Sequence, residues 1–222
     1  MVFGWITFKK YKVLQQTKSM RNIIARDLHD EIGATLSSIS FYSEACKINI
    51  INHQQDNSLQ LIDKIGVTSR STIHSMNDIV WMINPKNDAL GKLFDRIDNF
   101  GKELFVSRGI SFYFYSDPKL NNLILPIEHR KNLYLIIKEA LNNTAKYASC
   151  SQIELLIKSI GNQINVVIKD NGKGFDMTHL VEGNGLLNMR VRSTELGSKL
   201  MIESNPGKGT VLSFSLPSPP KW

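Results

Sequence analysis

The chain has 222 residues and a mass of 25.2 kDa, which is enough for one large domain or two small ones, each with its own core. Hydrophobic residues make up 42% and charged residues 21%, a balance that excludes disordered and low-complexity classes. The formal charge is +7, but residues 1–26 hold six basic residues and no acid, so the rest of the chain is close to neutral. The basic excess belongs to this segment alone, and we therefore expect no direct binding of nucleic acid.

Residues 1–19 are predicted to be a tail, in which MVFGWITF is followed at once by KKYK. Eight helical residues reach about 12 Å, which is too short to cross a hydrocarbon core of about 30 Å. The segment also lacks the basic start and the cleavage site of a signal peptide. Two interpretations stay open: an exposed start, or the cytoplasmic end of a membrane helix, which would attach a cytoplasmic protein to the inner face of the cell membrane.

Residues 11–51 are predicted to form one long helix, because they contain no proline and a single glycine, Gly33. Their apolar residues fall in steps of three or four and form one stripe: Ile24, Leu28, Ile32, Leu36 or Thr35, Ile39, Tyr42, Cys46 and Ile50. The polar residues 52–58 then predict a turn. A second amphipathic helix is expected from Leu59 to Ile83, where Pro85 disfavours its continuation.

Two long helices joined by a short turn form a hairpin that still exposes an apolar stripe. Pairing two hairpins would cover it, so the sequence predicts a homodimer with a four-helix bundle over residues 20–87. The alternative is that the stripe packs against the rest of the same chain. The cysteines Cys46 and Cys150 are too far apart, and too far from other ligands, for a disulfide framework or a zinc site.

The pattern changes near residue 87, which we take as a domain boundary, with a second domain at residues 88–217. Helices are expected at residues 89–108, 127–148 and 185–196, and strands at residues 110–115, 152–160, 163–169, 199–205 and 210–216. An antiparallel-leaning sheet with helices on one face is an α/β sandwich of the α+β class.

One face of the helix predicted at residues 127–148 is polar. Glu139, Asn143, Lys146 and Tyr147 lie at positions i, i+4, i+7 and i+8, so they share this face. The oxygen of an asparagine amide is a suitable Mg²⁺ ligand, and a lysine beside it suits phosphate charge. A solvated helix face is the other interpretation of this cluster.

Two glycine-rich segments follow. Asp170 opens the segment DNGKG directly after a strand, and an ionised carboxylate, which only accepts hydrogen bonds, suits an exocyclic amino group such as that of adenine. The glycines allow close approach of the backbone or a positive φ. Further along, Gly183 and Gly185 open a helix, whose free N–H groups would face an anion such as phosphate. Either segment alone is also typical of a turn.

Taken in order, these segments resemble the sensor histidine kinases. KEALNNTAKYA is similar to their N-box, DNGKGFD and GNGLLNMRVR to their two glycine boxes, and GKGTVLSFSLP to the last strands of the Bergerat (GHKL) ATP-binding fold shared with gyrase and MutL. RDLHDEIGATLSSI resembles the phosphoacceptor motif of the kinases whose response regulators carry LuxR-type DNA-binding domains. NDIVWMINPKND resembles the end of the second dimerisation helix in members with propeller-type sensor domains.

The resemblance implies a role for individual residues. His29 would be the phosphoacceptor, with Asp30 holding the other N–H of its ring. Asn143 would bind Mg²⁺ and Asp170 would read adenine. The remaining nucleotide contacts implied by the motifs are Lys146, Tyr147, Gly172, Gly174, Gly183, Gly185, Leu186, Arg190, Arg192 and Thr210. Residues 175–184 would form a lid over the nucleotide.

Two positions have particular consequences. Glu139 corresponds to a general base in water-activating relatives, whereas in kinases it would polarise a neighbour. Kinases of this type that also dephosphorylate their regulator carry Gln or His four residues after the acid, where this chain has Ala34, so weak phosphatase activity is expected.

The predicted function is an ATP- and Mg²⁺-dependent histidine kinase that phosphorylates His29 and passes the phosphoryl group to an aspartate of a response regulator. Two alternatives stay open: a GHKL-fold ATPase, and a dimeric scaffold that binds nucleotide without turnover.

Overall fold

The protein is described from a computed structural model, which defines residues 32–177 and 183–219. The chain divides into two compact units between Pro85 and Lys86. The predicted phosphoacceptor His29, its neighbour Asp30 and the basic tail lie outside the described residues.

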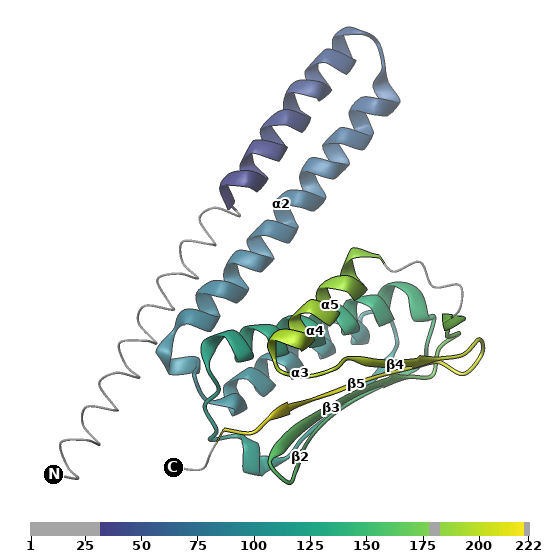
Figure 1. The fold of residues 1–222 in the computed structure, drawn as a ribbon. Helices are drawn as coiled ribbons and strands as arrows, with labels where there is room; N and C mark the ends of the chain where they lie inside the picture. The colour runs from purple at the N-terminus through teal and green to yellow at the C-terminus, as the bar shows by residue number, and fades with distance from the viewer. Residues whose placement is uncertain (1–31, 178–182, 220–222) are drawn as a thin grey trace, which may run out of the picture. The chain divides into compact units, whose positions relative to one another are not determined.

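The first unit is a helical hairpin. Residues 32–51 are helical, and α2 runs over Gln55–Ile83 (Figure 1). The turn is shorter than predicted. His53 takes a φ of 59°, and the N–H of Gln54 bonds to the carbonyl of Asn49 at 2.8 Å, which ends the first helix within three residues. The polar residues assigned to a turn therefore supply the first turn of α2, where Ser58 Oγ donates to the carbonyl of Gln54.

The two helices of the hairpin contact each other through part of their apolar residues only. Ile39, Tyr42, Ile65 and Thr72 are half-buried, and Cys46 is buried. A second set of apolar side chains stays exposed in the single chain: Leu36, Phe41, Ile48, Ile50, Ile62, Val67, Ile73, Met76 and Val80. The hairpin therefore carries an apolar surface beyond what the two helices cover on each other.

The second unit contains one five-stranded sheet in the order β1-β2-β3-β5-β4 (Figure 1). Its strands are β1 Ser111–Ser116, β2 Gln152–Ile160, β3 Gln163–Asp170, β4 Met201–Ser204 and β5 Thr210–Pro217. β1 pairs with β2 in parallel, and the other pairs are antiparallel. The predicted strands and the β2–β3 hairpin, which turns at Gly161 with a φ of 59°, are confirmed.

Three helices cover one face of this sheet: α3 Leu90–Val106, α4 Ile127–Asn143 and α5 Asn184–Glu195 (Figure 1). Short 3-10 turns lie at η1 Pro85–Asn87 and η2 Pro118–Leu120. Apolar positions that alternate along the strands, such as Leu155, Val166 and Phe214, are buried, and so are helix residues such as Leu133 and Ile137, so both layers contribute to the core. This is the α+β sandwich expected from the sequence.

The helix predicted at residues 127–148 is not α-helical throughout. α4 ends at Asn143, and η3 Thr144–Ala148 is a π-helical turn, followed by Ser149 with a φ of 52°. The loop after β3 holds this turn, because the N–H of Lys173 donates to the carbonyl of Ala148 at 2.8 Å. A π turn winds more widely than an α-helix, so it changes which side chains share a face.

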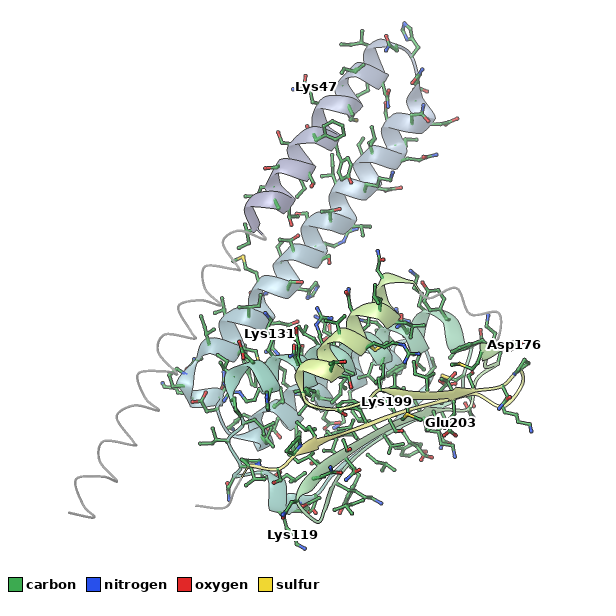
Figure 2. The ribbon with its side chains drawn as sticks, in the orientation of Figure 1. Lys47, Lys119, Lys131, Asp176, Lys199 and Glu203 are labelled. Atoms are coloured by element: carbon green, nitrogen blue, oxygen red, sulfur yellow. The ribbon has the colours of Figure 1, made fainter. Side chains whose placement is uncertain are left out.

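Charged side chains are spread over the second unit. Lys119, Lys199 and Glu203 are exposed and project from different elements (Figure 2). Within residues 32–177 and 183–219, no helix is long and apolar enough to cross a membrane. Both cysteines are free thiols, and burial and then the charge of Asp170 raise the pKa of Cys150.

Candidate functional site

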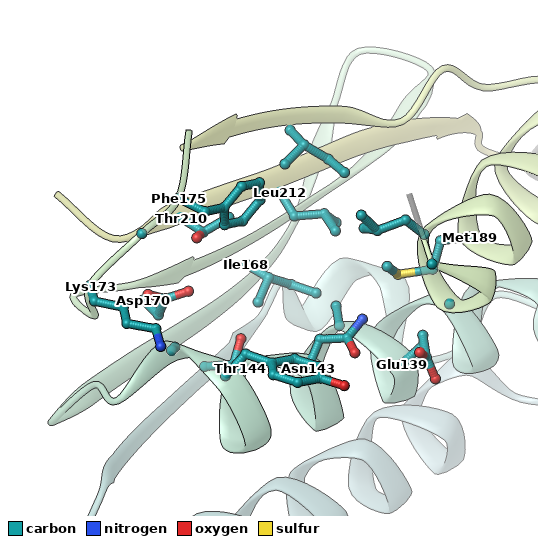
Figure 3. Close-up of a pocket in the computed structure, with 18 of the residues that line it drawn as sticks. Glu139, Asn143, Thr144, Ile168, Asp170, Lys173, Phe175, Met189, Thr210 and Leu212 are labelled. Carbon is teal, nitrogen blue, oxygen red and sulfur yellow. The ribbon is translucent and has the colours of Figure 1, made fainter. Parts of the chain in front are cut away.

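A cavity of about 560 Å³ lies between α4, η3, α5 and the strands that carry Asp170 and Thr210. Figure 3 shows Asp170 and Lys173 at one end and Glu139 and Met189 at the other. Ile168, Ile202, Leu212 and Phe175 give part of the wall an apolar character. This size and this combination of apolar wall and few polar groups are typical of a small-molecule site.

Asp170 is the acceptor at one end of the cavity. Its side chain is 5% exposed, and its Oδ1 accepts a hydrogen bond from the N–H of Gly172 at 2.9 Å. Burial raises the pKa of this carboxyl, while the N–H groups of Gly172 and Thr210 act in the opposite direction. A largely buried carboxylate held by backbone donors suits an amino group of a base better than it suits solvent.

The glycines around Asp170 allow three backbone segments to meet. A Cβ at Gly172 would collide with the carbonyl of Ala148, and one at Gly174 with the carbonyl of Asn205. Gly174 and Gly209 also have positive φ values of 57° and 73°. The first glycine box is therefore needed for close packing between the loop after β3, the π turn and the β4–β5 turn.

Glu139 and Asn143 extend from α4 toward the first turn of α5. A Cβ on Gly185 would occupy the place of Glu139 Oε1 and would lie 3.6 Å from the amide nitrogen of Asn143. The N-cap of α5 is Gly183, with no side chain bonded to the free N–H groups of the first turn. This end of the cavity combines two oxygen-bearing side chains with a helix N-terminus.

Most of the site residues predicted from the sequence line this cavity: Glu139, Asn143, Tyr147, Asp170, Gly174, Gly183, Gly185, Leu186 and Thr210. Lys146, Gly172, Arg190 and Arg192 do not line it. Lys146 instead lies with its Nζ 5.0 Å from the ring centre of Tyr147, and contact with Tyr147 raises its pKa. The shared face expected for an α-helix does not extend to Lys146 because the chain is π-helical there.

Several lining residues were not identified from the sequence, including Thr144, Lys173 and Met189. Two of the missed residues follow a simple rule. Ile168 and Leu212 each lie two residues inward from Asp170 and Thr210 on their strands, so they point to the same face. Met189 is four residues after Gly185 and could have been found from helical spacing.

The hydrogen-bond acceptors and oxygen ligands of the cavity fit Mg-ATP. Asp170 would accept from the adenine amino group, and Asn143, with Glu139 beside it, would offer oxygen atoms near the triphosphate. Among the described residues, no group of three or more His, Cys, Asp or Glu side chains could hold a metal by itself. Such a sparse set suits Mg²⁺, which takes much of its shell from phosphates and water.

Two family models match the chain. Residues 21–88 match the model HisKA_3, described as "Histidine kinase", and residues 128–220 match HATPase_c, described as "Histidine kinase-, DNA gyrase B-, and HSP90-like ATPase". The first range contains His29 and the whole described hairpin. The second contains the cavity.

Similar proteins carry kinase names. The chain is 29% identical over 210 residues to the signal transduction histidine-protein kinase/phosphatase DegS of Brevibacillus brevis, covering 93% of this chain and 53% of DegS. It is 28% identical to the sensor histidine kinase YhcY of Bacillus subtilis, covering 89% of this chain and 50% of YhcY. The chain thus spans about half the length of these relatives.

Solved structures show the same fold. The histidine kinase domain of the Erythrobacter litoralis EL346 blue-light activated histidine kinase matches with a TM-score of 0.57 at 20% identity, covering 74% of this chain and 85% of that domain. Acinetobacter baumannii AdeS matches with a TM-score of 0.57 at 10% identity, covering 86% and 98%. The solved structures show the fold, and the two family models, which together match more than half of the chain, show that it belongs to the sensor histidine kinases, with a HisKA_3 segment followed by a GHKL-type ATPase fold.

Proposed function

We propose that the protein transfers the γ-phosphoryl group of Mg-ATP to His29, and then to an aspartate of a response regulator. The observation that carries this proposal is the cavity that brings Asp170 and Asn143 together in a chain whose HisKA_3 segment contains the pair His29-Asp30. In the first step, the bond between phosphorus and the β–γ bridging oxygen breaks, a phosphorus–nitrogen bond forms and ADP leaves. In the second, the phosphorus–nitrogen bond breaks, a bond forms between phosphorus and a carboxylate oxygen of the regulator, and the His29 imidazole is regenerated.

The main task of the protein in this reaction is to align the γ-phosphoryl group with the His29 imidazole, because phosphoryl transfer depends on positioning and charge neutralisation more than on covalent catalysis. His29 offers a neutral ring nitrogen at cellular pH, and Asp30 would hold the other ring N–H and raise the basicity of the imidazole. Asp170 would fix the base. The free N–H groups at Gly183 and Gly185 would face phosphate, and Arg190, Arg192 and Lys146 would approach it when nucleotide binds.

Magnesium would be held by Asn143 together with the phosphates, and it would neutralise charge on the triphosphate. Glu139 lies beside the Cβ position of Gly185 and close to Asn143. Its role in this proposal is to polarise its neighbours at the triphosphate end of the cavity.

The proposed assembly is a homodimer, in which the exposed apolar side chains of two hairpins form a four-helix bundle. Residues such as Ile62, Met76 and Val80 support this, because they are exposed in the single chain. Light scattering should give about twice the chain mass of 25.2 kDa.

The proposed partner is a response regulator with LuxR-type output. The proposed location is the cytoplasm, where the N-terminal segment would attach the protein to the inner face of the membrane.

The test is incubation of the protein with γ-labelled ATP and Mg²⁺. Base-stable, acid-labile label is expected on the wild-type protein, because phosphohistidine has that stability pattern. The label should be lost in His29→Gln, which still binds ATP, and in Asn143→Ala, which lacks the metal ligand.

The same assay separates the alternatives. A GHKL-fold ATPase would release labelled phosphate with no label on the protein, and His29→Gln would not change its rate. A scaffold would bind ATP and neither release phosphate nor become labelled. Either result would contradict the kinase proposal.

A further inference from the structure

Ser204, the last residue of β4, lies behind the base end of the cavity and does not line it. Its side chain is 6% exposed. Three groups surround its Oγ: the N–H of Phe175 at 3.0 Å, the carbonyl of Gly209 at 3.1 Å and Thr210 Oγ1 at 3.1 Å. One hydroxyl thus joins the loop after β3 to the β4–β5 turn and to the side chain of Thr210.

The hydrogen-bonding capacity of a hydroxyl fixes the direction of these three bonds. A serine hydroxyl donates one hydrogen bond and accepts two. The N–H of Phe175 can only donate, and the carbonyl of Gly209 can only accept. If Ser204 gives its proton to Gly209, all three bonds form only when the hydroxyl of Thr210 donates to Ser204.

The consequence for Thr210 is that its proton points away from the cavity that the residue lines. Its oxygen can then offer only lone pairs to a bound base. The carboxylate of Asp170 is also an acceptor, and the N–H groups of Gly172 and Thr210 already bond to it. Asp170 and Thr210 therefore both present acceptors, which suit the 6-amino group of adenine and disfavour the 6-carbonyl of guanine.

We propose that Ser204 is a positioning residue for base selection, which holds the hydroxyl of Thr210 as an acceptor and thereby favours 6-amino over 6-oxo purine nucleotides. This inference rests on the proposed function, because it takes the cavity to be the ATP site. The backbone supports the arrangement: Ser204 and Thr210 are paired in the β4–β5 register, and the N–H of Gly207 donates to the carbonyl of Lys173 at 2.6 Å.

The experiment measures the affinities of the β,γ-imido analogues of ATP and GTP, which do not turn over, by calorimetry and competition. In Ser204→Ala, Thr210 is free to rotate and donate, so the ratio of adenine to guanine affinity should fall by about tenfold. Ser204→Thr keeps the hydroxyl and should keep the ratio close to that of the wild type. In a Thr210→Val background, Ser204→Ala should cause no further fall, because the group through which it acts is absent.

Two results would overturn the inference. The first is an equal loss of both affinities in Ser204→Ala, or a lower melting temperature with an unchanged ratio, which would mean that Ser204 is only structural. The second is a double variant, Ser204→Ala with Thr210→Val, in which the ratio of adenine to guanine affinity falls by the product of the two single-variant effects, which would mean that Ser204 does not act through Thr210. If instead the wild-type protein fails to bind the ATP analogue at all, the proposed function fails and the inference fails with it.

Discussion

At the scale of single residues, Asp170 shows how a functional group can work against stability. It is nearly fully buried, and burial raises the pKa of its carboxyl above the usual value of 3.8. In the range between the usual and the raised pKa, the folded protein binds more protons than the unfolded chain, so stability falls as pH rises through that range. At neutral pH, the ionised Asp170 therefore lowers the free energy of unfolding.

Asp170→Asn should remove this cost and also abolish adenine binding, because the amide would present a donor where an acceptor is needed. We expect the stability of the wild type relative to the variant to fall as pH rises from about 4, and the variant to melt no lower than the wild type at pH 7. Thermal unfolding between pH 4 and 8, with Asp95→Asn on the exposed side of α3 as control, measures this. A variant that is less stable at neutral pH but binds ATP normally would contradict the assignment.

Gly185 and Gly183 form a matched pair at the start of α5. A Cβ on Gly185 would meet Glu139, whereas a Cβ on Gly183 would have nothing within 4 Å. Gly185→Ala should therefore displace Glu139 and weaken ATP binding by at least about tenfold, equivalent to about 1.4 kcal/mol. Gly183→Ala should leave binding within about twofold. Calorimetric titration compares the two, and equal losses would show that general rigidity of the loop, and not the position of Glu139, controls binding.

At the scale of elements, the sequence predicted the strands and most helices because alternation and helical spacing are local properties. The two boundaries that differ by more than two residues depend on contacts or torsion angles that composition does not encode. α2 starts early because His53 adopts a positive φ, and α4 ends at Asn143 because the loop at Lys173 holds a π turn. The same π turn explains why Lys146 could not be placed by α-helical spacing, whereas Glu139 and Asn143 could.

Because His53 adopts the left-handed conformation, we expect its replacement by glycine to stabilise the hairpin. A residue with a side chain is strained at a φ of 59°, by roughly 1–2 kcal/mol, and glycine is not. After the entropy cost of glycine in the unfolded chain, His53→Gly should raise the free energy of unfolding by about 0.5–1 kcal/mol. His53→Ala keeps a Cβ and should bring no such gain. Chemical denaturation followed by circular dichroism compares the two variants, and a gain in both would exclude this explanation.

At the scale of the whole molecule, the order of the motifs carried more information than any one of them. A single glycine segment is typical of many turns, but the cavity collects Asn143, Asp170, Gly185 and Thr210 from separate parts of the chain. Sequence reasoning could not supply the links that hold these parts together, such as the carbonyl of Ala148 against Gly172, because they join positions with no shared pattern. It also could not identify Ser204, whose proposed role depends on the three hydrogen bonds of its hydroxyl.

The alanine at position 34 leads us to expect weak phosphatase activity toward the phosphorylated regulator. It is exposed on the described helix 32–51, and an alanine side chain cannot orient a water molecule. We expect the protein with ADP to remove little label from phosphorylated regulator, and Ala34→Gln to accelerate that loss, since Gln is tolerated in a helix at a cost of a few tenths of a kcal/mol. Ala34→Ser, which is also polar, serves as control. Rapid loss of label with the unchanged protein would refute this expectation.

The proposed reaction places the γ-phosphoryl group of ATP on His29, and peptide mapping tests this directly. Trypsin should release residues 27–47 as one peptide, in which His29 is the only histidine. After incubation with Mg-ATP and digestion at neutral pH, mass spectrometry should find one added phosphoryl group on this peptide, located on His29 and absent from Asn143→Ala. Phosphate on a different peptide, or on a serine or threonine of this one, would contradict the account.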